Sequence, residues 1–395
     1  MQPIVEENQI KKVKRLNKRL ILLFIYVVSV SMGIFFIYTQ VKGNNKNMLS
    51  GIKMFSDGDI LFCAMNDKLY SYDNESQKFN LILNEPVYEV LVFNNFLFYT
   101  NKKGLYYLLL DTSEKRSIVE FGKETIEQYI KGGDIYYNFV REYCNNLYMY
   151  ENSLYFVYCI NIDIMPDTHT VNGMEKWIVL YRFDVETQSI KNVKTSYRNS
   201  MLNDISINDL YIRDGILYYH NSTEVYSIEL STGCEKIIYQ TPYNHSTITK
   251  IDWLENSFNC IEIIENDNTI LNQSKIGNYF SNYDMSGVEI YSLHIDFDLF
   301  HSLNINDMFF DNKSQTYYTT RENTLISFKF DEVQNYSTII AIEKNSHEIY
   351  NIIKINDELF VSINDGISKV SSSILLISKR NEITNLTKNG KAIFN

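Results

Sequence analysis

The sequence of 395 residues predicts an all-β protein, a β-propeller of about seven four-stranded blades, preceded by one transmembrane α-helix. Three observations support this prediction. A polar turn followed by an apolar, aromatic triplet recurs roughly every 50 residues, and short runs with period-two alternation follow it. One uncharged apolar segment lies near the N-terminus. Six or eight blades also fit the spacing, because residues 132–137 do not match the repeat.

The composition excludes several classes of protein. Hydrophobic residues make up 45% of the chain, too many for a disordered protein, and five Cys are too few for a disulfide scaffold. A net charge of -11 argues against a nucleic-acid partner. With only 15 Gly and 4 Pro, the chain must build most of its turns from other residues. The 31 Tyr and 23 Phe require an architecture that packs many aromatic rings.

The predicted membrane segment comprises residues 20–39, which carry no charged side chain and can cross a bilayer core of about 30 Å as one helix. Six basic and two acidic residues precede it, so residues 1–39 carry +4 and the remainder -15. Positive flanks stay in the cytoplasm. We therefore expect a cytoplasmic stub (1–19), a single-pass signal anchor in the cell membrane (20–39), a linker (40–51) and an extracellular propeller (52–395). A cleaved signal peptide and a buried core helix are the alternatives.

The repeat begins with a short polar turn that is followed by an apolar triplet such as Leu97-Phe98-Tyr99. Seven such turns occur, starting at Asp57, Asn94, Asn152, Asp214, Asn256, Asn312 and Asn356. A period of roughly 40 to 50 residues with about four short strands is typical of propeller blades. A β-sandwich also has short strands between turns, but it needs no fixed period.

Alternating runs follow these triplets, at residues 68–73, 179–185, 224–230 and 324–330. One parity is aromatic or aliphatic, as with Tyr226, Ile228 and Leu230 in the third run, so we expect strands with one more deeply buried face. Polar turns such as Asp73-Asn74-Glu75-Ser76 end the runs. Asp and Asn bond their own backbone and tolerate left-handed conformations, so they replace the scarce Gly and Pro.

Several stretches share a motif of aromatic and Thr residues. Residues 98–101 read Phe-Tyr-Thr-Asn, 217–220 read Leu-Tyr-Tyr-His, and 317–320 read Tyr-Tyr-Thr-Thr. These stretches resemble the Tyr-Trp-Thr-Asp propellers of low-density-lipoprotein receptors, with Trp absent from the motif position. They resemble more closely a bacterial extracellular domain of unknown function that is related to those propellers and common in low-GC Gram-positive bacteria. The resemblance covers most of residues 52–395 and implies a propeller fold and an extracellular location.

Two places hold candidate ligand-binding residues. The longest break in the repeat, residues 161–176, contains Asp163, Asp167, His169 and Glu175. Long loops on a rigid scaffold often carry binding sites, although a variable loop without a role is an equal alternative. The run at residues 294–298 would place His294, Asp296 and Asp298 on one face of a strand, where three ligand-type side chains point together. An ordinary half-buried strand with a polar outer face is the alternative there.

The five cysteines, Cys63, Cys144, Cys159, Cys234 and Cys260, are odd in number and widely spaced. Three of them lie in apolar strand-like runs, so the expected role is that of a small buried hydrophobic residue. One disulfide is compatible with an extracellular location, but the spacing names no pair.

These features indicate a non-enzymatic module that binds a protein or a cell-envelope component. The alternative is a propeller enzyme, a hydrolase or lyase acting on cell-envelope glycan, which would need two carboxylates about 5 to 10 Å apart in an accessible pocket. The sequence contains no P-loop, no G-x-G-x-x-G, no G-x-S-x-G and no C-x-x-C motif. We therefore predict no catalytic residue, cofactor, metal ligand or nucleic-acid partner, and a membrane association only through residues 20–39.

Overall fold

The fold was determined as a computed structural model. It describes residues 52–57, 60–122, 137–164, 173–198, 206–242, 246–264, 277–305, 308–321, 324–341, 347–365, 372–378, 383–388 and 391–392. The predicted stub, membrane segment and linker (residues 1–51) lie outside this part of the chain. In the described part, no helix is long and apolar enough to cross a membrane.

The described strands form seven four-stranded antiparallel sheets, each built from four consecutive strands in simple meander order. Blade 1 comprises β1 (Lys53–Asp57), β2 (Ile60–Met65), β3 (Lys68–Asp73) and β4 (Lys78–Leu83); blade 2 comprises β5 (Glu89–Phe93), β6 (Phe96–Asn101), β7 (Gly104–Leu109) and β8 (Lys115–Glu120). Blade 3 comprises β9 (Tyr137–Tyr150), β10 (Ser153–Ile164), β11 (Gly173–Asp184) and β12 (Ser189–Arg198); blade 4 comprises β13 (Asn208–Arg213), β14 (Ile216–His220), β15 (Glu224–Glu229) and β16 (Cys234–Gln240).

The second half of the described chain continues the same pattern. Blade 5 comprises β17 (Thr247–Trp253), β18 (Ser257–Ile264), β19 (Gly277–Asp284) and β20 (Glu289–Ile295); blade 6 comprises β21 (Phe309–Asp311), β22 (Thr316–Arg321), β23 (Thr324–Lys329) and β24 (Ser337–Ala341). Blade 7 comprises β25 (His347–Ile355), β26 (Glu358–Asp365), β27 (Ser372–Ile377) and β28 (Ile383–Asn385). Short elements join these strands: the helix α3 (Phe297–Ser302), the 3-10 helix η2 (Phe330–Asn335) and the strand pair β29 (Thr387–Lys388) and β30 (Lys391–Ala392).

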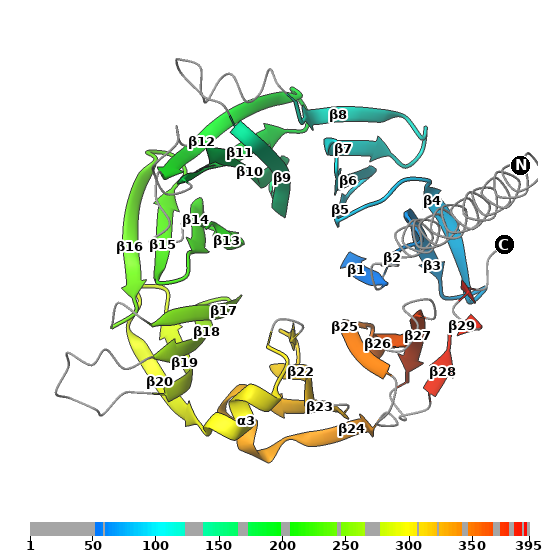
Figure 1. The fold of residues 1–395 in the computed structure, drawn as a ribbon, viewed down its shortest axis with the longest axis vertical. Helices are drawn as coiled ribbons and strands as arrows, with labels where there is room; N and C mark the ends of the chain where they lie inside the picture. Colours follow the sequence, from blue (N-terminus) through cyan, green and yellow to red (C-terminus); the bar gives the residue numbers. More distant parts are fainter. Residues whose placement is uncertain are drawn as a thin grey trace, which may run out of the picture. The chain divides into compact units, whose positions relative to one another are not determined.

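The seven blades surround a central axis, with the first strand of each blade nearest to it and the fourth strand at the perimeter (Figure 1). First strands of neighbouring blades contact one another, including β1 with β5, β5 with β9, β9 with β13, and β1 with β25. The contact between β1 and β25 joins the first blade to the last, so the ring is closed. The chain therefore folds as a seven-bladed β-propeller, and the predicted blade number is confirmed.

Apolar side chains are buried between the blades. The described part contains seven apolar clusters, and each lies between two adjacent blades. The cluster that closes the ring packs Tyr72 and Phe79 of blade 1 against Ile353 and Phe360 of blade 7. Each blade is thus covered on both faces, and burial of apolar area is what holds neighbouring sheets together.

The predicted repeat corresponds directly to the strand order. All seven turn positions fall in the hairpin between the first and second strands of a blade, and the apolar triplets form the second strands. The polar turns at residues 73–76 and 184–187 connect third to fourth strands. Their side chains bond their own backbone as predicted, because Asp73 Oδ1 accepts from the Glu75 amide at 2.9 Å. Among the described non-glycine residues with positive φ, eight of thirteen are Asn or Asp.

The expectation of one buried face per alternating run is only partly correct. Tyr72 on β3 and Phe328 on β23 are buried as predicted. On β15, however, Val225 of the opposite parity is fully buried, whereas Tyr226 is only half-buried. The reason is that a blade packs against a neighbour on each face, so both parities enter a core.

Many tyrosines pack as amphipathic rings with a hydroxyl at a polar edge. Tyr99 stacks on Tyr106 with ring centroids 5.7 Å apart, and Lys115 lies over both rings. Glu85 accepts hydrogen bonds from the Tyr99 hydroxyl at 2.7 Å and from Lys115 Nζ at 2.6 Å. The same arrangement recurs with Tyr219, Tyr226, Lys194 and Glu235. Rings with an apolar body and a polar tip suit this boundary, which accounts for the Tyr excess.

All five cysteines are free thiols. Cys63, Cys144, Cys159 and Cys260 are buried, as the sequence predicts for small hydrophobic residues, and Cys234 is exposed. The disulfide that the sequence left open does not form in this structure. Burial raises the pKa of the Cys63, Cys144 and Cys260 thiols, which keeps them protonated and unreactive.

Candidate functional site

A ring of polar side chains lies on the inner strands, four to six residues before the turn positions of the sequence repeat. Its described members, named here the inner polar ring, are Lys53, Glu89, Asn146, Asp209, Lys250 and Asn351. The corresponding residue of blade 6, Asp307, lies outside the described residues. Apolar side chains precede or follow these positions on most strands, so a polar residue here serves a specific contact.

Each described member of the inner polar ring bonds the backbone of the next blade. Three members donate to a backbone oxygen: Lys53 Nζ to Tyr88 O at 2.5 Å, Asn146 Nδ2 to Ile207 O at 2.6 Å, and Lys250 Nζ to Met308 O at 2.6 Å. The other three accept from a backbone amide: Glu89 Oε1 from Leu147 N at 2.9 Å, Asn351 Oδ1 from Met54 N at 2.9 Å, and Asp209 from Ile251. These bonds satisfy backbone groups that would otherwise face the axis without a partner. The inner polar ring therefore links neighbouring blades.

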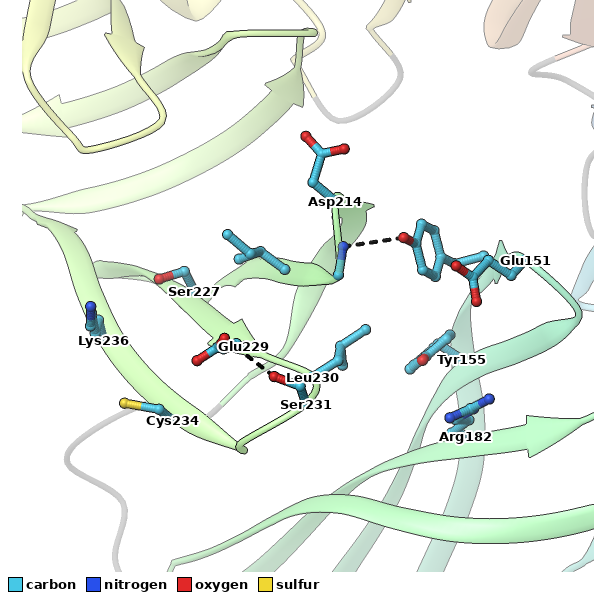
Figure 2. A pocket seen from close by; sticks show the side chains of 13 residues that line it. Glu151, Tyr155, Arg182, Asp214, Ser227, Glu229, Leu230, Ser231, Cys234 and Lys236 are labelled. Carbon is cyan, nitrogen blue, oxygen red and sulfur yellow. Dashed lines mark hydrogen bonds between the residues drawn. The ribbon is translucent and has the colours of Figure 1, made fainter.

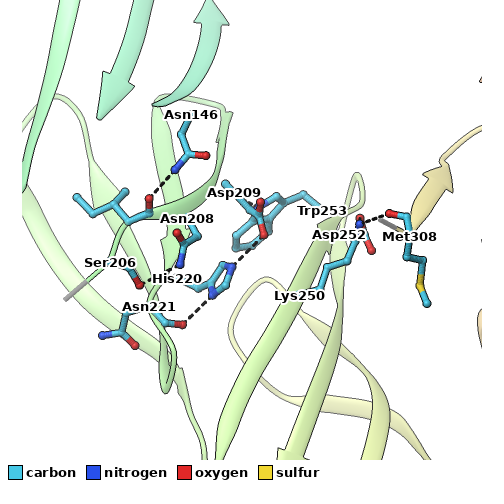
Figure 3. A network of polar contacts seen from close by, with 11 residues as sticks. Asn146, Ser206, Asn208, Asp209, His220, Asn221, Lys250, Asp252, Trp253 and Met308 are labelled. Carbon is cyan, nitrogen blue, oxygen red and sulfur yellow. Dashed lines mark hydrogen bonds and ion pairs between the residues drawn. The ribbon is translucent and has the colours of Figure 1, made fainter. Parts of the chain in front are cut away.

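The most elaborate polar network lies where blades 4 and 5 meet (Figure 3). His220 at the end of β14 is buried, and its Nε2 lies 2.9 Å from Asp209 Oδ2. Its Nδ1 lies 2.7 Å from the carbonyl oxygen of Asn221. A carbonyl and a carboxylate only accept hydrogen bonds, so each ring nitrogen of His220 faces an acceptor of the chain.

The pKa of Asp209 is held below its ordinary value. Burial acts to raise this pKa, but the hydrogen bond and charge of His220, the Lys250 ammonium and the Ile251 amide together outweigh burial. Asp209 also has a left-handed backbone with φ of 49°, at an irregularity in the pairing of β13 with β14. Trp253 of β17 donates its indole N–H to the Asp209 carbonyl oxygen. Side chain and backbone of Asp209 are thus both tied to blade 5.

A second chain of polar contacts runs from Lys250 towards blade 6. Lys250 Nζ lies 3.5 Å from Asp252 Oδ1, and Asp252 Oδ2 accepts from the Tyr317 hydroxyl at 2.9 Å. Asn259 Nδ2 donates to the same hydroxyl at 3.0 Å. Burial raises the pKa of Asp252, with the nearby Asp209 carboxylate adding to the rise. Asp209 and Asp252 are two neighbouring carboxylates, but each is already bonded within the chain.

A pocket of about 420 Å³ opens beside the His220 and Asp209 pair, and it is named here the polar pocket. Eight of its nine lining residues are polar: Asn146, Ser206, Asn208, Asp209, His220, Ser222, Thr247 and Thr249. They come from the first strands of blades 3, 4 and 5, from the end of β14 and from the adjoining turns. The polar pocket therefore offers hydroxyl and amide groups rather than an apolar surface.

A larger pocket of about 680 Å³ lies between blades 3 and 4, beside their hairpin turns (Figure 2). Its walls carry Glu151, Arg182, Asp214, Glu229 and Lys236 among aromatic and aliphatic side chains. The Tyr150 hydroxyl accepts a hydrogen bond from the Gly215 amide at 3.1 Å and joins the two blades there. Charges of both signs line this pocket, so it favours no single ligand charge. Its greater volume alone does not make it the better site.

The predicted binding loop at residues 161–176 is shorter than expected. Strands β10 and β11 continue into it, with Asp163 opposite Met174 and Glu175 opposite Ile162 in the ladder. Asp163 and Glu175 are therefore strand residues rather than loop residues. Asp167 and His169 lie outside the described residues, so the loop assignment for these two stays a prediction.

The expectation that His294, Asp296 and Asp298 share a strand face is wrong, because β20 ends at Ile295. Asp296 instead caps α3, where its Oδ1 accepts from the Asp298 amide at 3.0 Å. An Asp side chain just before a helix accepts hydrogen bonds from the unpaired backbone amides of the first turn. This stabilises the start of a helix at Asp296, so the strand does not continue. The His294 ring packs against Tyr279 with centroids 5.2 Å apart. Among the residues that the structure describes, no group of three or more His, Cys, Asp or Glu is placed to hold a metal ion.

Sequence reasoning missed the inner polar ring and the polar pocket. The signal for the ring was present, as one polar residue four to six positions before each turn of the repeat. The signal for the pocket was not, because Asp209 and His220 are identified as partners only by the pairing of β13 with β14.

Comparisons with known proteins name no family for this chain. No family model matches the chain, and no curated protein matches it. Among solved structures, the chain is similar to the CNH domain of AfRom2, with 10% identity, a TM-score of 0.44, and coverage of 80% of this chain and 91% of that one. It is also similar to a chain of the Mitotic Checkpoint Complex, with 9% identity, a TM-score of 0.46 and 88% coverage of both chains. A third is Hsv2p of Kluyveromyces lactis, with 10% identity, a TM-score of 0.42, and coverage of 85% and 97%.

Proposed function

We propose that this chain is a non-enzymatic binding module, anchored at the outer face of the cell membrane by residues 20–39, which holds a protein or cell-envelope partner on its propeller. The proposal for the anchor rests on the uncharged apolar segment with its basic flank. The resemblance to bacterial extracellular propellers related to those of low-density-lipoprotein receptors supports the same location. A propeller supports many unrelated activities, so the choice of binding over catalysis must come from the site.

The observation that carries this choice is the state of His220. A general base needs a ring nitrogen that is free to take a proton from a substrate or a nucleophile. Both nitrogens of His220 lie within hydrogen-bond distance of acceptors within the chain, at 2.7 Å and 2.9 Å. The carboxylates nearby are similarly engaged, Asp209 by His220 and Asp252 by Tyr317. Groups held in this way form a rigid wall for recognition.

The test is to incubate the purified full-length chain, in phosphatidylcholine nanodiscs, with isolated envelope polymer from the cells that express it. Co-sedimentation of the chain with intact polymer, and no new soluble fragments by mass spectrometry, is the result expected of a binding module. Release of glycan fragments that depends on Asp209 or Asp252 would instead establish the hydrolase or lyase alternative. Protection of residues 52–395 from protease added to intact cells would refute the extracellular location.

A further inference from the structure

We infer that the polar pocket binds a neutral, polyhydroxylated ligand, a short segment of a glycan. This inference deepens the proposed function and rests on it, because it names the ligand class of one site on the binding module. Three features of the polar pocket carry it: its paired charged groups, its open hydrogen-bonding capacity and its rigid walls.

The charged groups around the polar pocket are paired within the chain. Asp209 Oδ2 lies 2.9 Å from His220 Nε2, and the Asp209 carboxylate also accepts from the Ile251 amide. Lys250 lies beside Asp252, with Nζ and Oδ1 3.5 Å apart. A charged ligand would lose its hydration here without meeting an unpaired countercharge, which is unfavourable. A neutral ligand has no such penalty.

The polar pocket also has hydrogen-bonding groups left over. Asn146 and Asn208 use their Nδ2 groups within the chain, at 2.6 Å to Ile207 O and at 2.9 Å to Ser206 Oγ. The Thr249 hydroxyl of the pocket is buried without a hydrogen-bond partner among the described residues. Within that part of the chain, the Asn146 and Asn208 Oδ1 atoms and the Ser222 and Thr247 hydroxyls make no hydrogen bond either. Amide oxygens accept hydrogen bonds, and Ser and Thr hydroxyls both donate and accept. Sugar hydroxyl groups are also both donors and acceptors, so they match this set.

The walls are held in place before a ligand arrives. His220 is 3% exposed, and the Asp209 backbone is bonded by the Trp253 indole. The Asn146 side chain is fixed by its bond across to blade 4. Pre-organised side chains lose little conformational freedom on binding, so even a few hydrogen bonds yield measurable affinity. A volume of about 420 Å³ lies in the range of small-ligand sites.

The test is isothermal titration calorimetry with the full-length chain in phosphatidylcholine nanodiscs, which avoids sugar-based detergents. The probe is chitotetraose, a neutral oligosaccharide, with an oligogalacturonate of equal length as the anionic comparison. We expect chitotetraose to bind and the anionic oligomer to bind at least about tenfold more weakly. Asn208→Leu should weaken chitotetraose binding about tenfold, because it removes the open amide oxygen.

The matched control is Asn192→Leu on the outer strand β12, where Asn192 Nδ2 makes a comparable local bond to Thr195 Oγ1 at 2.7 Å. This variant should bind chitotetraose like the wild type. If Asn208→Leu fails to fold, Ser222→Ala removes a different open group of the same pocket. Equal affinity in the wild type and in a folded pocket variant, or tighter binding of the anionic oligomer, would overturn the inference.

The same experiment separates this inference from the proposed function. Absence of chitotetraose binding, together with co-sedimentation of the chain with envelope polymer, would refute the ligand class and leave the binding module standing. Cleavage of chitotetraose, detected by mass spectrometry after the titration, would refute the non-enzymatic function and leave the ligand class standing.

Discussion

Asn351 of β25 accepts a hydrogen bond at its Oδ1 from the backbone amide of Met54 on β1, at 2.9 Å and across 297 positions of the sequence. This bond joins the last blade to the first. Every strand of blade 7 comes from the C-terminal end of the propeller, and every strand of blade 1 from its N-terminal end. Closure therefore depends on this bond and on the apolar cluster between the two blades, without an exchanged strand.

The substitution Asn351→Leu should destabilise the propeller by about 1 to 3 kcal/mol, because it leaves the Met54 amide without an acceptor. Chemical denaturation measures the loss, and hydrogen exchange should show faster exchange of the Met54 amide. The control is Asn80→Leu on the exposed outer strand β4, which should change stability by less than about 0.5 kcal/mol. Equal effects of the two variants would contradict a role for Asn351 in closure.

The ion pair between Asp311 of blade 6 and Lys354 of blade 7 should stabilise the adjoining interface. Its atoms lie 2.6 Å apart, and both side chains are 13% exposed. Asp311→Asn should cost about 1 to 3 kcal/mol at neutral pH. Burial raises the pKa of Asp311, but the Lys354 and Ser314 side chains lower it by more, so the net shift is downward from 3.8.

A lowered pKa makes the Asp311 contribution present above pH 3.8 and lost as the pH falls through the lowered value. The difference in unfolding free energy between the wild type and Asp311→Asn should therefore shrink towards zero in acid. Denaturation curves at several pH values between neutral and strongly acidic conditions measure this. A difference that stays constant into acid would contradict the ion pair.

Glu262 should make the propeller less stable as the pH rises. It is buried at 1% exposure, and burial raises its pKa above 4.5 despite hydrogen bonds from the Tyr239 and Tyr283 hydroxyls. A raised pKa means that its contribution is present below pH 4.5 and is lost as the pH rises through the raised value. Glu262→Gln should thus gain stability relative to the wild type between pH 4 and pH 8, measured by denaturation at both. The same difference at both pH values would exclude this mechanism.

Gly287 is required where the turn between β19 and β20 approaches blade 4. Its φ is +84°, and a Cβ atom would lie 1.7 Å from the Ile238 carbonyl oxygen of β16. Gly287→Ala should destabilise the chain by about 2 to 3 kcal/mol, since backbone must move. Gly233→Ala is the control, because it shares a positive φ of +71° but meets nothing within 4 Å, and about 1 kcal/mol is expected. Thermal denaturation that ranks the two equally would remove the steric argument.

Thiol labelling should follow burial. One maleimide per chain should react under native conditions, at Cys234, and four more should react after denaturation. Cys234→Ser should abolish the native label. Fewer than five labels after denaturation without reductant would indicate a disulfide and contradict the free thiols.

The sequence determined the architecture because its repeat depends on the conformational preferences of residues that are close together in the chain. Turn residues such as Asn94 and Asp214 tolerate left-handed backbone conformations without help from distant residues, and their φ values are 53° and 50°. Strand alternation is likewise a property of neighbouring residues. For this reason the seven first hairpins were predicted at the correct positions, and the blade number followed from them.

Only the tertiary structure decided which polar residues meet. Asn351 and Met54 become partners through ring closure, and His220 meets Asp209 through a strand pairing that the sequence does not specify. The role of Asp296 was also decided by the tertiary structure. The alternating sequence predicted a strand through this residue, but its side chain caps the helix α3 instead. Local patterns specify backbone conformation, whereas contacts between distant residues depend on how all seven blades pack against one another. The polar pocket depends on such contacts between distant residues, because its lining comes from three blades and shares no sequence motif.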